Sequence, residues 1–113
     1  MGETENLYEE KSELLKALAH PLRLEIVRGL LVGGCHNVRC MEAGTGQSQS
    51  TISQHLMRLK AAGVVKCERL GNEMHYEVSD PAAAAVVAAL FGDEESDYNC
   101  PMILQLSAEA LQD

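Results

Sequence analysis

The chain has no apolar run of the roughly 20 consecutive residues that a membrane-spanning helix requires. It also lacks the basic start of a secretory signal peptide, because residues 1–13 contain one lysine and five glutamates. Neither membrane insertion nor secretion is expected. The sequence therefore predicts a cytoplasmic protein.

Basic residues are missing from the last part of the chain. Residues 81–113 contain six acidic side chains and no lysine or arginine, and residues 1–13 are also acidic. Residues 14–80 hold eight basic and six acidic side chains, so the net charge of -8 conceals a mildly basic middle segment. A nucleic-acid binder depends on such a local excess of basic residues. The acidic ends either confer solubility or tune the affinity for DNA, and the sequence favours neither.

The four cysteines, Cys35, Cys40, Cys67 and Cys100, do not suggest the framework of a disulfide-rich secreted domain. In a chain without a secretion signal we expect reduced thiols. A bond between two of them would then act as a switch and not as a permanent cross-link.

Length and hydrophobic periodicity predict one domain with an interface helix near each end. A chain of 113 residues forms a single domain that a partner subunit would help to stabilise. We expect this domain at 1–92, beginning with an amphipathic helix at about 7–19. Residues 82–91 are apolar on every face, so they need a buried place, and a dimer interface would provide one. Residues 93–113 are expected to form an acidic linker and a short C-terminal helix or tail.

Three further helices are expected between these two. One begins at Pro21, whose missing N–H is harmless in a first turn, and stops at a Gly-Gly pair. A brief helix follows at about 38–43. The third has Ser48 as its N-cap and ends near Ala62. A short helix, a turn and a second helix with a polar outer face predict a helix-turn-helix.

The segment after this helix predicts a β-hairpin. Residues 64–70 are strand-like, Gly71-Asn72 form the turn, and residues 74–78 alternate apolar and polar side chains. A hairpin directly behind the second helix of a helix-turn-helix is a wing. The expected fold class is mainly α with a small β-hairpin: a homodimeric winged helix-turn-helix.

Three segments resemble the ArsR/SmtB family of bacterial repressors. They are LAHPLRLEI at 18–26, SQSTISQHL at 48–56 and LKAAGVV at 59–65, followed by Tyr76 in the second wing strand. The resemblance covers roughly residues 14–78. It implies a homodimer with the first and last helices at its interface, which binds an imperfect palindrome in double-stranded operator DNA.

The helix that begins after Ser48 carries the side chains that a major-groove reader needs. Serine and glutamine present short donors and acceptors to base edges, and glutamine can pair bidentately with adenine. The resemblance places the serines and glutamines at base edges or nearby phosphates. The basic residues lie further along the helix and in the wing, where they are better placed for phosphates. The DNA-contacting set is Gln49, Ser50, Thr51, Ser53, Gln54, Arg58, Lys60, Lys66 and Arg69. His55 lies off the polar face and is expected to position the helix. The alternative is a solvated face without DNA contacts.

Both metal sites typical of this family are missing from the sequence. The zinc-type site needs Asp and His on the last long helix, but no histidine follows His75 and residues 82–91 contain no ligand. The arsenic-type site needs Cys-x-Cys at the short helix, where this chain has Val38-Arg39-Cys40. No metal site is therefore assigned.

The cysteines remain as candidates for sensing a signal. A pair formed by Cys35 or Cys40 with Cys100 resembles in outline the dithiol switches of persulfide-sensing and redox-sensing relatives. Its closure would tie the DNA-reading half to the dimer helices. The alternatives are a soft metal or metalloid at the thiolates, namely As(III), Cu(I) or Cd(II), and inert thiols. Cys100-Pro101 also matches a haem-regulatory motif, but two residues are too few to support haem binding.

Two other classes of function were compared with a DNA-binding regulator. An enzyme would need a nucleophile and base such as Cys35-His36, but adjacent residues seldom align in this way and no acid orients His36. We therefore expect no enzyme. A winged-helix module that binds proteins and not DNA would suit the net acidity, although the intact segment from Ser48 to Lys60 argues against it.

Overall fold

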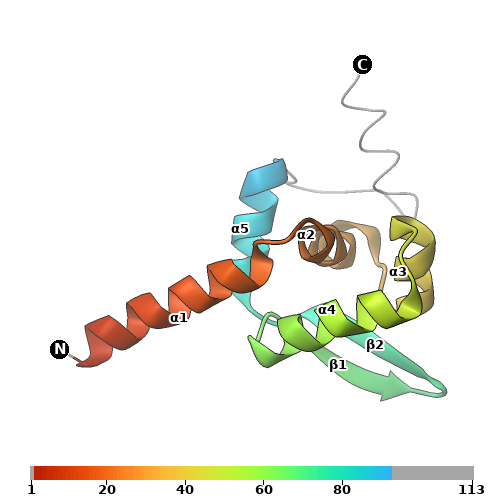
Figure 1. The fold of residues 1–113 in the computed structure, drawn as a ribbon, viewed down its shortest axis with the longest axis horizontal. Coiled ribbons are helices and arrows are strands. Elements are labelled where there is room, and N and C mark those ends of the chain that lie inside the picture. The colour runs from red at the N-terminus through yellow and green to blue at the C-terminus, as the bar shows by residue number, and fades with distance from the viewer. Residues whose placement is uncertain (1, 93–113) are drawn as a thin grey trace.

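The computed structural model describes residues 2–92, with side chains from residue 6 onward. In chain order its elements are α1 Gly2–Leu18, α2 Pro21–Arg28, the π-helical turn η1 Gly29–Gly33, α3 Val38–Thr45, α4 Gln49–Ala61, β1 Val65–Leu70, β2 Glu73–Val78 and α5 Pro81–Phe91. Figure 1 shows α2, α3 and α4 in the body of the molecule, with α5 beside them, the hairpin next to α4, and α1 projecting outward. A helix-turn-helix followed by a two-stranded wing is the fold class that the sequence predicts. Within the described residues, no helix has the length and apolar character needed to cross a membrane.

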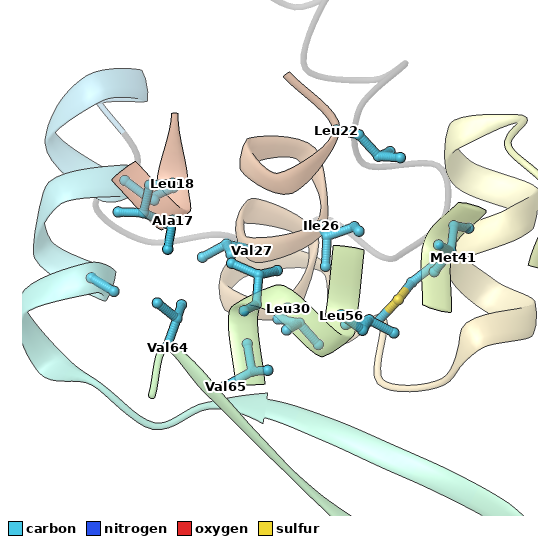
Figure 2. Packing of buried hydrophobic residues seen from close by; sticks show 14 of the residues in the cluster. Ala17, Leu18, Leu22, Ile26, Val27, Leu30, Met41, Leu56, Val64 and Val65 are labelled. Atoms are coloured by element: carbon cyan, nitrogen blue, oxygen red, sulfur yellow. The ribbon is translucent and has the colours of Figure 1, made fainter. Parts of the chain in front are cut away.

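The core lies where α2, α4 and α5 meet, and the end of α1 completes it. Its largest fully buried side chains are Ile26, Val27, Ile52, Leu56, Leu59, Val64 and Val87. Figure 2 shows Val27 of α2 with Ala17 and Leu18 of α1 on one side and Leu30 on the other. Ile52, Leu56 and Leu59 of α4 belong to the same buried cluster, and because protein interiors are close-packed, this cluster holds α4 firmly against α1 and α2.

Two helix boundaries differ from the prediction. The first helix begins at Gly2, ahead of Leu7, and the prediction missed this start because residues 2–6 contain charged residues and no apolar pattern. The second ends at Arg28, and a π-helical turn continues to Gly33. A Cβ on Gly29 would lie 3.7 Å from the Cβ of Cys35, so this wider turn packs closely against the following segment.

The short helix α3 is also longer than predicted. Gly44 lies inside it, and Gly46 ends it with a φ of 78°, a left-handed conformation that favours glycine. The Thr45 hydroxyl donates to the carbonyl oxygen of Met41 over 2.8 Å, which holds the last turn. In Figure 2 the Met41 side chain of α3 points towards Leu56 of α4, so α3 packs on the helix behind it.

The wing is anchored at its base and exposed at its tip. Strands β1 and β2 pair antiparallel from Val65 opposite Val78 to Leu70 opposite Glu73. The Ser79 N–H donates to the carbonyl oxygen of Val64 over 2.8 Å and its hydroxyl donates to that of Gly63 over 3.0 Å. The first strand begins one residue later than predicted because the Val64 N–H still donates to Leu59 at the end of α4. The hairpin is thus fixed to the C-terminal end of α4.

Candidate nucleic-acid interface

Helix α4 begins where the sequence predicts. The Ser48 hydroxyl accepts a hydrogen bond from the backbone N–H of Thr51 over 3.2 Å, which is the N-cap interaction. The Ser48 hydroxyl also donates to that of Thr51 over 3.0 Å. The Thr51 hydroxyl is therefore engaged in the cap, which gives this member of the predicted DNA-contacting set a role inside the protein.

The two sides of α4 differ sharply in burial. Ile52, Leu56 and Leu59 are at most 2% exposed and fix the helix to the core. The exposed members of the predicted set on this helix are Gln49, Ser50, Gln54, Arg58 and Lys60, while Thr51 and Ser53 are half-buried. Met57 is 70% exposed on the same outer side, so the whole stripe is available to a ligand.

A groove of about 420 Å³ runs along one flank of α4. It is lined by Gln49 and Ser53 of α4, Arg39 and Glu42 of α3, and residues of β2 that include Tyr76. The structure thus brings two predicted DNA contacts beside an exposed arginine that the prediction left out. The signal that could have found Arg39 is a basic residue near the start of the first helix of a helix-turn-helix.

The wing contributes basic side chains of unequal availability. Lys66 lies opposite Glu77 in the register and its ammonium group is 3.2 Å from that carboxylate. Both side chains are more than half exposed, so the pair is weak and can exchange for a phosphate contact. Arg69, opposite Met74, is exposed. Burial, followed by the nearby Cys67, raises the pKa of Tyr76 in the wing, and Lys60 of α4 partly opposes this rise.

A short segment before α3 ties the helix-turn-helix to the wing. The backbone N–H of Tyr76 donates to the carbonyl oxygen of His36 over 2.7 Å, and the His36 ring Nδ1 lies 3.2 Å from the carbonyl oxygen of Tyr76. Next to it, Asn37 caps α3 by accepting from the Cys40 N–H over 2.8 Å and donates to Glu73 over 3.4 Å. Movement of this segment would therefore shift α3 and the wing together.

Comparison with known proteins agrees with this arrangement. Residues 20–66 match the family described as bacterial regulatory protein, arsR family. The transcriptional repressor PagR of Bacillus anthracis is 37% identical over 82 residues, which cover 73% of this chain and 82% of PagR. The chain belongs to the ArsR family. It is a DNA-binding transcriptional regulator with a winged helix-turn-helix, as the resemblance implied.

Solved structures of relatives have the same fold. The PagR crystal structure superposes with a TM-score of 0.70 at 34% identity, covering 76% of this chain and 98% of PagR. The repressor BigR of Xylella fastidiosa gives 0.69 at 33% identity, covering 80% and 92%. A homodimeric winged helix-turn-helix DNA-binding domain from Mycobacterium bovis, a possible ArsR-family regulator, gives 0.68 at 27% identity, covering 77% and 80%.

In this ArsR-family regulator His55 holds α4 from its inner flank. The Arg23 Nε donates to His55 Nδ1 over 3.2 Å, and the His20 ring centroid lies 4.4 Å from that of His55. Burial lowers the pKa of His55 below its usual 6.5, and the adjacent His20, Arg23 and Arg58 lower it further. The position of His55 off the outer face agrees with the prediction from helical periodicity, whereas periodicity did not reveal Arg23 as its partner.

The cysteines of the regulator differ in their state. Cys35 is 3% exposed and disulfide-bonded. Cys40 and Cys67 are half-buried and not disulfide-bonded, and burial raises the pKa of Cys40, which disfavours its reactive thiolate. Cys100 and the predicted acidic linker lie outside the described residues. Within residues 2–92 no group of three or more His, Cys, Asp or Glu side chains could hold a metal ion.

Large apolar side chains remain exposed on the two helices that the prediction assigned to a dimer. On α1 and α5 they are Leu7, Tyr8, Leu15, Leu90 and Phe91, with exposed fractions from 43% to 69%. Within the chain α5 buries only one side, through Ala83 and Val87, although its sequence predicted burial all round. The Arg28 guanidinium carbon lies 4.6 Å from the centre of the Phe91 ring and fixes the end of α5.

Proposed function

We propose that the chain is a homodimeric repressor that binds an imperfect palindrome in operator DNA and releases it when thiols are oxidised. The observation that carries the DNA-binding part is the exposed polar stripe of α4, placed beside a wing and backed by a fully buried face. A major groove admits one α-helix, and such a stripe matches the donors and acceptors of base edges. Gln49, Ser50, Ser53 and Gln54 read bases in this proposal.

The basic side chains hold the DNA backbone. Arg58 and Lys60 extend from the last turns of α4, and Lys66 and Arg69 extend from the wing. Contacts to phosphates fix the orientation of the protein on the duplex without reading its sequence. Arg39 joins this set because it lines the groove that also contains Gln49 and Ser53.

The proposed dimer is supported by the apolar surface that α1 and α5 leave uncovered. Leu15 on α1 is 53% exposed and Leu90 on α5 is 63% exposed. Large exposed apolar side chains that gather on neighbouring helices mark an interaction surface. A two-fold dimer presents two copies of α4, which suits the two half-sites of a palindrome.

The test of DNA reading compares Gln54→Ala with Asn6→Ala on the chain's own upstream DNA. Gln54 is exposed on the outer side of α4, and Asn6 is an exposed amide on α1. Loss of a bidentate base contact costs about 1–3 kcal/mol, so Gln54→Ala should bind its operator at least several-fold more weakly and unrelated DNA unchanged. Equal affinities of the two variants for the operator would contradict the assignment of Gln54.

A second candidate function is a winged-helix module that binds proteins and not DNA, which the net charge of -8 favours. DNA binding through phosphates falls steeply with salt concentration. An electrophoretic shift with the upstream DNA at several salt concentrations separates the two functions. Binding that weakens with salt supports the repressor, and no binding at any salt concentration supports the module.

For the releasing signal we propose a disulfide between Cys35 and Cys100. Support comes from the disulfide-bonded state of Cys35, whereas Cys40 and Cys67 do not take part in a disulfide. Two thiols lose two electrons and two protons to an oxidant such as diamide, which becomes the hydrazine, and the S–S bond forms. Cys35 directly precedes His36 and Asn37, so a bond at this residue would pull on the contacts that hold the wing and cap α3.

The test measures operator binding before and after diamide or a polysulfide for the wild type and three serine variants. Cys35→Ser and Cys100→Ser should keep binding DNA after oxidant, whereas the wild type and Cys40→Ser should release it. Unchanged binding by the oxidised wild type would rule out the switch. Release on adding As(III), Cu(I) or Cd(II) to the reduced protein would instead favour the soft-metal alternative.

A further inference from the structure

A basic groove lies beside the base-reading stripe, at the junction of α1, α2 and α4. It has a volume of about 350 Å³ and is lined by Lys16 of α1, Arg23 of α2 and Arg58 of α4. Small side chains, Ala17, Ala61 and Ala62, line the space between them. The small side chains let an elongated anion approach the protein backbone closely, while the three basic side chains surround it.

The groove is continuous with the outer side of α4. Arg58 and Ala61 line the groove, and both are exposed on the side of the helix that carries Gln54 and Met57. A ligand that lies along this stripe therefore reaches the groove without a gap. The groove is separate from the proposed dimer surface, because Lys16 is turned by about 100° around α1 from Leu15.

Arg23 is held in place by the protein itself. Its Nη1 donates to the carbonyl oxygen of Ala17 over 3.0 Å and its Nε donates to His55 over 3.2 Å. A guanidinium group has five N–H donors, so this geometry uses two and leaves others for a ligand. The side chain therefore needs little ordering when it binds an anion.

Lys16 can exchange its present partner. Its ammonium group lies 3.4 Å from the Glu13 carboxylate, and the two side chains are 74% and 70% exposed. Exposed pairs of this kind contribute little stability and are readily replaced by a stronger anion. With Glu13 included, the groove still has an excess of positive charge in a chain whose net charge is -8.

We propose that Lys16, Arg23 and Arg58 form a second phosphate-binding site that holds the operator backbone beside the recognition helix. This inference rests on the proposed binding of operator DNA and adds residues from α1 and α2 to it. Phosphate contacts orient a protein on the duplex. Here they also link the end of α1, a proposed dimer helix, to the DNA.

The experiment compares Lys16→Gln with Lys11→Gln, which removes the same charge from the same helix outside the groove. Operator affinity is measured at several salt concentrations. Log affinity falls with log salt, and each lost phosphate contact makes this slope less steep by about 0.9. Lys16→Gln removes two contacts in a dimer, so its slope should be less steep by about 1.8. Lys11→Gln should change the slope much less. Glu13→Gln should bind more tightly than the wild type at low salt.

Two results would separate the possible failures. If the wild type binds the operator but Lys16→Gln and Lys11→Gln show the same dependence of affinity on salt, the proposed phosphate site in the groove is wrong and the proposed function stands. A wild type without salt-sensitive binding would overturn the proposed function and this inference together. Thermal unfolding and sedimentation of each variant check the fold and the dimer, and Arg58→Gln provides a second variant in the same groove with the same expected slope.

Discussion

Among single residues, His55 links the stability of the protein to pH. Its pKa is lowered in the folded chain, so folding favours the neutral ring. This contribution to stability is present above the unfolded pKa of about 6.5 and is lost as pH falls from there through the folded pKa. The free energy of unfolding should therefore decrease from pH 7.5 to pH 5.5.

The variant His55→Asn tests this contribution, because its amide oxygen can still accept from Arg23 but does not titrate. Urea unfolding at pH 7.5, 6.5 and 5.5 should show a smaller loss of stability for the variant than for the wild type. Parallel curves for the two proteins would show that His55 does not contribute to the pH dependence.

Sequence reasoning succeeded for residues whose role depends on neighbours along the chain and failed for those that depend on distant ones. Helical spacing separated the buried Ile52 from the exposed Gln54, and a serine before a helical pattern predicted the cap. Arg23 and His55 are 32 positions apart, so no local pattern connects them. Their contact follows from how α2 crosses α4, which periodicity does not specify.

At the scale of elements, Asn37 joins α3 to the wing through one side chain. Replacing it with alanine removes the cap and the contact to Glu73, and should destabilise the protein by about 1 kcal/mol. Replacing it with aspartate retains the cap but places a carboxylate against Glu73. We expect Asn37→Asp to keep most of the stability while the wing becomes looser.

Amide hydrogen exchange measures this difference directly. The Tyr76 N–H donates to His36 next to the substituted position, so it should exchange faster in Asn37→Asp than in the wild type. The Ile52 amide, bonded to Ser48 within α4, serves as the reference. Equal exchange of the Tyr76 amide in both proteins would show that Asn37 does not hold the wing.

The order and type of the elements could be predicted, whereas several ends could not. Alternating side chains predicted the hairpin, and glycines marked the stops near Gly33 and Gly46. The π-helical turn was missed because five residues are too few to establish a spacing that differs from that of an α-helix. The start of α1 was missed because its first turns carry charged residues and no apolar stripe.

For the whole molecule, the exposed apolar surface of α1 and α5 predicts association. Leu15→Glu should convert the proposed dimer into a monomer, because a carboxylate would be buried without a partner at the interface. Leu70→Glu is a matched control, since the two leucines are 53% and 49% exposed and Leu70 lies in the wing. Analytical ultracentrifugation should show a change of mass only for Leu15→Glu; a dimeric Leu15→Glu would place the interface elsewhere.

The separation of buried and exposed residues on α4 has a consequence for how such regulators diverge. Folding depends on Ile52, Leu56 and Leu59, while outward positions such as Ser50 and Gln54 are exposed and contribute little to the core. After a gene duplication, a few substitutions at the outward positions could give one copy a new operator at little cost in stability. The two copies would then regulate different genes while answering the same signal.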